Sequence, residues 1–134
     1  MNLAVLYIST LIPFLIIDIV ALRTVMLPLF ERHVGALLAD DTKLGVALGF
    51  YMFYVAGIIY FAILPGVRAE QPSLVILNGA LLGFIAYGTY EATNMATLKG
   101  WSWSMVATDV VWGAILTASS AYLGYLIARG FGAI

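Results

Sequence analysis

The chain has 134 residues, of which 63% are hydrophobic and only 10% are charged, and its mean hydropathy is +1.04. Soluble domains carry about 25% charged residues, so this composition indicates an integral membrane protein. The formal net charge of −1 provides no basic field for nucleic acid. The absence of cysteine excludes disulfides, thiol catalysis and thiolate metal sites, and a single histidine is too few for a histidine-built metal centre.

The first apolar segment runs from about residue 3 to residue 25, close to the ~20 residues that a helix needs to cross a bilayer. No basic residue precedes it and no small-residue cleavage site closes it, so we expect a retained helix and not a signal peptide. The next stretch, residues 28–38, has an apolar spacing that favours a short helix lying in the membrane interface. The apolar residues of that stretch are Leu29, Val34, Leu37 and Leu38.

Three further apolar segments follow, at about residues 43–64, 73–98 and 102–128. The second segment is expected to stop at Pro65-Gly66, and Pro72 suits the start of the third. Four segments of this length cannot close a β-barrel, so only helices satisfy the backbone in lipid. The sequence therefore predicts an all-α fold: one domain, residues 1–134, forming a four-helix transmembrane bundle with short loops.

Basic residues near the segment ends predict the orientation. The side with the first and third connections carries Arg23, Arg32, Lys43 and Lys99, whereas the side with both termini carries Arg68 and Arg129. The positive-inside rule then places both termini outside the cytoplasm. Five aromatic residues near the segment ends suit ordinary interfacial anchors: Tyr60, Trp101, Trp103, Tyr122 and Tyr125.

Small residues recur at four-residue spacing in the second, third and fourth segments, which permits close approach of helix backbones in lipid. These faces are Gly45-Gly49-(Phe53)-Gly57, in which Phe53 interrupts the small residues, Gly79-Gly83, Gly113-Thr117-Ala121 and Ser120-Gly124-Ala128. The simpler interpretation is that they close the bundle. The alternative is that one face, most plausibly Gly79-Gly83, forms a homodimer.

Three carboxylates, Asp18, Glu91 and Asp109, lie inside these apolar segments. Each is seven residues from the segment end on the side of the first and third connections, which is roughly 10 Å at 1.5 Å per residue. A charge in hydrocarbon costs from ~3 to ~10 kcal/mol or more, so carboxylates at one depth need partners, water or a ligand. Arg23 is one partner within reach of Asp18.

The neighbours of these carboxylates are polar or aromatic and share their depth. We therefore predict an intramembrane polar site. Its candidate residues are Asp18, Tyr54, Tyr87, Tyr90, Glu91, Asn94, Thr97, Asp109 and Trp112, and Tyr51 falls at a similar depth. Three interpretations remain open: polar pairing that fixes helix register, a site for the head of an amphiphile, and a proton or ion path.

The string Tyr87-Gly-Thr-Tyr-Glu-Ala-Thr-Asn-Met-Ala-Thr-Leu-Lys-Gly-Trp101, with Asp109-Val-Val-Trp-Gly113, resembles a bacterial family of four-helix inner-membrane proteins, domain of unknown function 2177. Asp18, the patch 50–54 and Gly57 also fit, and members commonly have Asp where this chain has Glu91. The resemblance implies a bacterial inner-membrane location. Members are sometimes encoded beside enzymes resembling cyclopropane fatty-acid synthases, which implies work on lipids.

The leading hypothesis is that the polar site binds or modifies a membrane lipid or hydrophobic small molecule. In that case Asp18, Glu91 and Asp109 contact the head group or act as acid and base. Alternatives are an accessory subunit of a larger membrane complex and a small proton or ion transporter. No reaction follows from the residues. The sequence implies no cofactor and no resident metal, although three carboxylates have the chemistry to hold a divalent cation.

Overall fold

A computed structural model describes the whole chain, residues 1–134, and contains helices and no strands. Four helices are long and apolar enough to cross a membrane, which confirms the predicted all-α, four-span fold. The first comprises α1 (Leu3–Ala21), a π-helical turn (Leu22–Met26), α2 (Leu27–Val34) and a 3-10 turn (Gly35–Leu37). The second comprises α3 (Leu44–Ile58), a π-helical turn (Ile59–Ile63) and α4 (Leu64–Arg68), and the others are α5 (Pro72–Thr97) and α6 (Trp103–Gly130).

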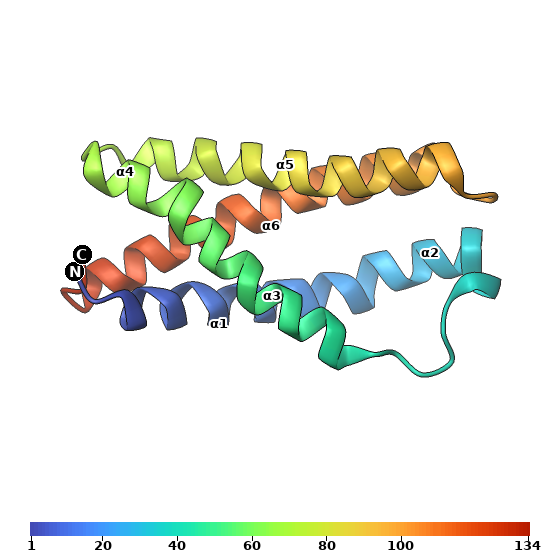
Figure 1. The fold of residues 1–134 in the computed structure, drawn as a ribbon, viewed down its shortest axis with the longest axis horizontal. Helices are drawn as coiled ribbons and strands as arrows, with labels where there is room; N and C mark the ends of the chain where they lie inside the picture. The colour runs from blue at the N-terminus through green and yellow to red at the C-terminus, as the bar shows by residue number, and fades with distance from the viewer.

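The chain crosses from one end of the bundle to the other four times, so its ends and connections sort into two groups (Figure 1). The terminal end holds both termini and the α4–α5 connection, residues 69–71. The N–H of Asn2 donates to the carbonyl of Ala133 across 2.8 Å, which ties the two termini together. The loop end holds the connections 38–43 and 98–102.

Besides Pro13 in α1, two prolines lie inside continuous helices, each two residues after a π-helical turn: Pro28 and Pro65. A proline ring collides with the carbonyl of the fourth residue before it and donates no hydrogen bond. Those residues are Thr24 and Phe61, and both lie within the π-helical turns. The wider π-helical turn accommodates the ring without ending the helix.

These turns explain where the helices differ from the segments expected from the sequence. Residues 28–38 do not begin a separate interfacial helix, because α1 continues through its π-helical turn into α2 and on to Leu37. The second span likewise passes Pro65-Gly66 and ends at Arg68. At 1.5 Å per residue the 35-residue first helix is about 50 Å long, so it extends beyond the hydrocarbon core.

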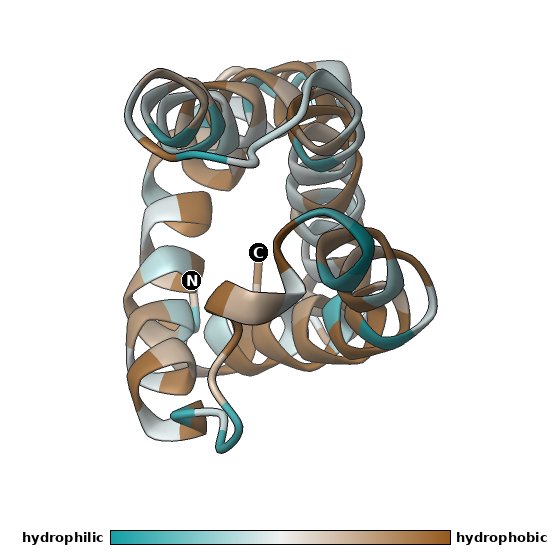
Figure 2. Cartoon of the chain, turned by 90° about the vertical axis from the view of Figure 1, so that its right-hand side faces the viewer, coloured by the Kyte–Doolittle hydropathy of each residue, from teal (hydrophilic) through white to brown (hydrophobic).

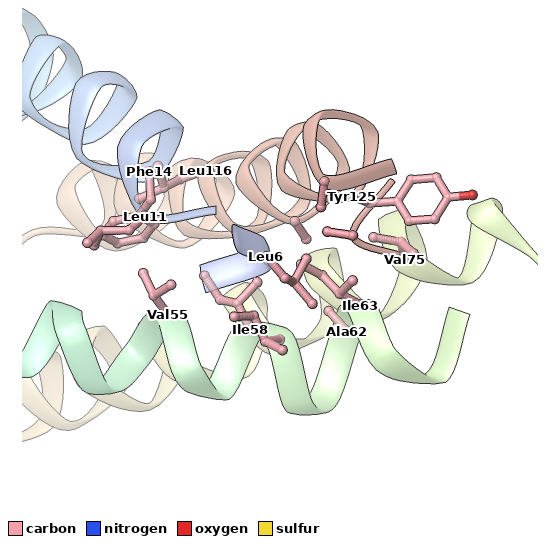
Figure 3. Close-up of a cluster of buried hydrophobic side chains, with 14 residues drawn as sticks. Leu6, Leu11, Phe14, Val55, Ile58, Ala62, Ile63, Val75, Leu116 and Tyr125 are labelled. Carbon is pink, nitrogen blue, oxygen red and sulfur yellow. The ribbon is translucent and has the colours of Figure 1, made fainter. Parts of the chain in front are cut away.

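A cluster of buried apolar side chains fills the terminal half of the bundle (Figure 3). It joins α1, α6 and the second half of the second span. Leu6, Phe14 and Leu116 are fully buried there, as are Val55 and Ile58. This half therefore has a continuous core.

Glycines allow α5 and α6, the most extensively packed helix pair, to approach closely. A Cβ at Gly79 would meet the backbone of Ala118, and one at Gly83 would collide with the carbonyl of Gly113. The Gly79-Gly83 face thus closes the bundle within one chain and is not free for a second copy. Gly45 and Gly49 on α3, by contrast, have no atom within 4 Å of a Cβ position.

The loop half of the bundle is more open. The second span joins α5 through the Ile59–Ile63 turn and α4, whereas α3 runs diagonally away from α5 toward the loop end (Figure 1). Viewed from that end, the four spans surround a common axis, and hydrophilic residues gather at the helix ends and in the connection facing the viewer (Figure 2). No residue of α3 before Val55 is buried.

Candidate functional site

A cavity of about 780 Å³ occupies the loop half, between all four spans. We call it the central cavity. Its walls come from α1 and the turn after it, α2, α3, α5 and α6. The lining residues are Asp18, Leu22, Met26, Leu27, Phe30, Phe50, Tyr51, Tyr54, Ala86, Tyr87, Thr89, Tyr90, Asp109 and Trp112. A cavity of this size is within the ~300–1,000 Å³ range of small-molecule sites.

Asp18 lies on the face of α1 that points into the bundle, and its side chain is buried. Its polar neighbours are the phenol of Tyr51 on α3 and the indole of Trp112 on α6. Both groups can donate hydrogen bonds, as a buried carboxylate requires. Arg23, the partner expected from the sequence, is exposed and is not among these neighbours.

Asp109 and Glu91 form a pair of carboxyl groups on the closely packed helices α6 and α5. Asp109 lies against the Glu91 side chain and within electrostatic range of Asp18. Glu91 is 0% exposed and lies behind the cavity wall. Its Oε2 accepts a hydrogen bond of 2.7 Å from the indole N–H of Trp101, whereas its Oε1 has no partner. Two carboxyl groups in contact form a hydrogen bond when one of them carries a proton.

Trp101, in the connection at the loop end, packs against two residues that line the cavity. Its ring packs edge-on against Phe30 of α2, with centroids 5.4 Å apart, and against Tyr90 of α5, with centroids 6.2 Å apart. The sequence predicts an interfacial anchor at this position, but the structure gives the indole an internal hydrogen bond to Glu91. Trp103, which is 70% exposed, keeps the position expected of an anchor.

Aromatic rings form most of the inner wall, and contacts from the core fix several of them. The hydroxyl groups of Tyr54 and Thr117 are hydrogen-bonded at 2.7 Å. Tyr51 packs against the buried ring of Phe14 with centroids 5.2 Å apart. The ring of Tyr87 covers Gly113, where any larger residue would displace it. The core of the terminal half thus positions the floor of the cavity.

The nine residues predicted from the sequence fall into three groups. Six line the central cavity: Asp18, Tyr54, Tyr87, Tyr90, Asp109 and Trp112. Two do not line it: Glu91 lies behind the wall against Asp109, and the half-buried Asn94 lies beside Tyr90. Thr97 is exposed and donates its hydroxyl to the carbonyl of Thr93, so the structure does not bring it to the cavity.

Several lining residues carried no polar signal in the sequence. Phe30, Leu27 and Met26 reach the cavity only because the first helix continues past the predicted boundary at Val25. Thr89 also lines the cavity, one position before Tyr90 in the recognisable string. For the part of the wall that α3 forms, the sequence offered one indication, which was the spacing of Tyr51 and Tyr54.

The central cavity opens between α3 and α5. Phe50 on α3 and Tyr90 on α5 line it and are 62% and 52% exposed, respectively. Because both helices span the membrane, this opening faces the side of the bundle, where lipid chains lie. Toward the loop end, Phe30 lines the cavity and packs against Trp101.

The charges that the cavity lining can carry are of one sign only, which is negative. Its lining includes two carboxyl groups and no lysine, arginine or histidine. No group of three or more carboxylate or imidazole side chains is close enough together to hold a metal ion, so Asp18, Glu91 and Asp109 do not form a three-ligand set. A second groove of about 750 Å³, between α1 and α6, is lined mainly by apolar residues and holds no carboxylate.

The sequence matches the family described as "Predicted membrane protein (DUF2177)" over residues 3–126, so the chain belongs to that family. This agrees with the resemblance seen in the sequence. No curated protein and no solved structure matches the chain.

Proposed function

We propose that this member of the DUF2177 family binds a membrane lipid or another hydrophobic molecule with a polar head in its central cavity. The observation that carries the proposal is the position of the buried carboxyl groups Asp18 and Asp109 in a cavity that opens between α3 and α5. The head of the ligand contacts these carboxyl groups, and its apolar part leaves through the opening. Glu91 positions Asp109 from behind the wall.

The energetics of membranes support a ligand at this place. Ionisable residues within spans are expensive, so by default they indicate function. The register interpretation predicts that each carboxyl is paired within the protein. Asp18 and Asp109 do have polar neighbours within the protein, but both also line open space, which polar pairing alone does not require. An amphiphile entering from the side would supply polar contacts without exposing its chain to water.

The proposal also includes an orientation. Arg32, Lys43 and Lys99 lie at or near the loop end, and Arg68 and Arg129 at the terminal end. The positive-inside rule then assigns the loop end to the cytoplasm and both termini to the periplasm of an inner membrane. In this arrangement the head group is held in the cytoplasmic half of the bilayer.

A cavity-filling variant tests the proposal. Ala86 lines the cavity from α5, so Ala86→Trp should occupy the space of the ligand. Ala92 lies on the same helix, is exposed and does not line the cavity, so Ala92→Trp is the matched control. Native mass spectrometry of protein extracted in mild detergent should detect a bound hydrophobic molecule in the wild type and in Ala92→Trp, and little in Ala86→Trp. Equal occupancy in all three proteins would refute the proposal.

A second candidate function, a subunit of a larger membrane complex, is favoured by one observation. The first half of α3 buries no residue, and Gly45 and Gly49 leave its surface accessible to another helix backbone. If this surface binds a partner, other proteins should co-purify in stoichiometric amounts, and Gly49→Leu should release them. A chain that purifies alone would exclude this candidate.

A further inference from the structure

We infer that the ligand of the central cavity is a lipophilic cation, in which a quaternary or protonated amine is attached to an apolar body. This inference rests on the proposed function and specifies its ligand class. Three features of the cavity lead to it: the sign of its charge, the nature of its walls and the position of its opening.

The charge of the lining excludes an anionic head. Asp18 and Asp109 are the only carboxyl groups in the wall, the other ionisable lining groups are tyrosines, and both carboxyl groups carry negative charge when deprotonated. The nearest basic residue along the first helix, Arg23, is exposed and outside the lining. A phosphate or carboxylate head would lose its hydration, meet no cation and face two acidic groups. A cationic head would instead pair with them.

The walls have the composition of an aromatic cage. Seven of the fourteen lining residues are aromatic, against 13% of the whole chain. They are Phe30, Phe50, Tyr51, Tyr54, Tyr87, Tyr90 and Trp112. The faces of such rings attract cations, most strongly when the cation is desolvated, and cages of this kind bind quaternary ammonium groups. The aromatic side chains come from all four spans, so they surround the space instead of forming one stripe.

The position of the opening indicates the chemistry of the remaining part of the ligand. Phe50 and Tyr90 flank a path from the cavity to the membrane side of the bundle. Leu22, Leu27 and Ala86 add apolar surface next to the acidic groups. A small hydrophilic cation would leave this surface uncovered. A cation with an apolar body covers both parts of the lining.

The test uses two ions of the same shape and opposite charge, tetraphenylphosphonium and tetraphenylborate. Each is titrated calorimetrically into purified protein in dodecyl maltoside, with empty micelles as the blank. We expect saturable binding of tetraphenylphosphonium and at least tenfold weaker binding of tetraphenylborate. Equal affinities, or preference for the anion, would overturn the inference.

Substitutions then connect binding to the cavity. Asp109→Asn and Asp18→Asn should each weaken tetraphenylphosphonium binding at least tenfold, whereas Asp40→Asn, in the exposed connection 38–43, should leave it unchanged. Tyr51→Leu should weaken binding several-fold and Tyr51→Phe much less, because phenylalanine keeps the ring face. If an aspartate variant does not fold, the comparison of Tyr51→Leu with Tyr51→Phe still shows whether the cation binds in this cavity. Unchanged binding in Tyr51→Leu and in the folded aspartate variants would overturn the assignment to this cavity.

Competition distinguishes a lipid-like ligand from a small free cation. Dodecyltrimethylammonium and tetramethylammonium share a head and differ in the tail. We expect the former to displace tetraphenylphosphonium at least tenfold better, and equal potency would overturn the apolar part of the inference. If neither tetraphenyl ion binds but Ala86→Trp still removes a native hydrophobic molecule, the charge class is wrong and the proposed function stands. If neither ion binds and Ala86→Trp changes nothing, both are wrong.

Discussion

The terminal half and the loop half of this bundle use the same helices in different ways. In the terminal half, the apolar cluster around Leu6, Ile58 and Leu116 is fully buried, and Gly79 and Gly124 bring helix backbones into contact with their neighbours. In the loop half, α3 buries no residue before Val55, and a cavity with two carboxyl groups lies between the four spans. One half is close-packed and the other is open.

This difference indicates a division of roles within one small domain. Helices in lipid associate through close packing and polar contacts, because burial from lipid supplies no hydrophobic gain. The terminal half provides such packing, so it holds the spans together. The loop half can then keep polar groups and open space, which a binding site needs and which would destabilise a bundle without a rigid support.

The largest expected effect compares two leucines on the first helix. Leu6 is fully buried in the terminal half, so Leu6→Ala should destabilise the protein by about 2–5 kcal/mol through the cavity it leaves. Leu22 lines the central cavity, where the space already exists, so Leu22→Ala should cost less than about 1 kcal/mol. Thermal unfolding in detergent, followed by tryptophan fluorescence, measures both. Equal losses would contradict the division into a packed and an open half.

A second prediction concerns the hydrogen bond between Trp101 and Glu91 in the loop half. Trp101→Phe removes the indole donor to the fully buried Glu91 and should cost about 1–3 kcal/mol, the range for a buried acceptor that loses its partner. Trp103→Phe changes an exposed indole and should leave the unfolding temperature unchanged. The double variant Trp101→Phe, Glu91→Leu should recover part of the loss, because it leaves no orphaned carboxylate. No recovery would mean that Trp101 acts mainly through its packing on Phe30 and Tyr90.

Two glycines of α5 sharpen the comparison along a single helix. A Cβ at Gly83 collides with the Gly113 carbonyl, so Gly83→Ala should destabilise the bundle by about 1–3 kcal/mol. A Cβ at Gly88 meets nothing within 4 Å, so Gly88→Ala should stabilise by about 0.5–1 kcal/mol through helix propensity. Opposite shifts in unfolding temperature are therefore expected five residues apart. Shifts of the same sign would show that α5 and α6 separate easily.

The smallest effect is expected where the two halves meet. Tyr54→Phe removes the hydroxyl that pairs with Thr117 at 2.7 Å and should cost about 1 kcal/mol. Tyr60 is exposed, so Tyr60→Phe is the matched control and should be neutral. Tyr54→Phe should keep the aromatic ring that faces the cavity, because only the hydroxyl group is removed. A loss larger than that of Gly83→Ala would mean that the cavity wall, and not the glycine contact, carries the stability of the bundle.

Part of the candidate site was accessible from the sequence, because ionisable residues inside apolar segments are rare enough to be singled out. Asp18 and Asp109 were found in this way, and both line the central cavity. The first helix runs to Leu37 and not to residue 25, so their equal depth stays a prediction. The contact between Trp101 and Glu91 was not predictable in this way. It depends on the turn that follows α5, where Gly100 has a φ of 80°, and no spacing rule states where the chain returns after such a turn.

The sequence by itself determined that this is a four-span α-helical membrane protein with carboxyl groups inside its spans, because span length and charge cost are set by the bilayer. Only the tertiary structure decided which face of each helix is buried. In water an apolar stripe marks that face, but a helix in lipid is apolar all round and carries little such signal. The tertiary structure therefore assigned Gly79-Gly83 to the α5–α6 contact and left Gly45 and Gly49 exposed. It also joined α1 to α2 and opened the cavity between α3 and α5, because both depend on how the helices bend and pack.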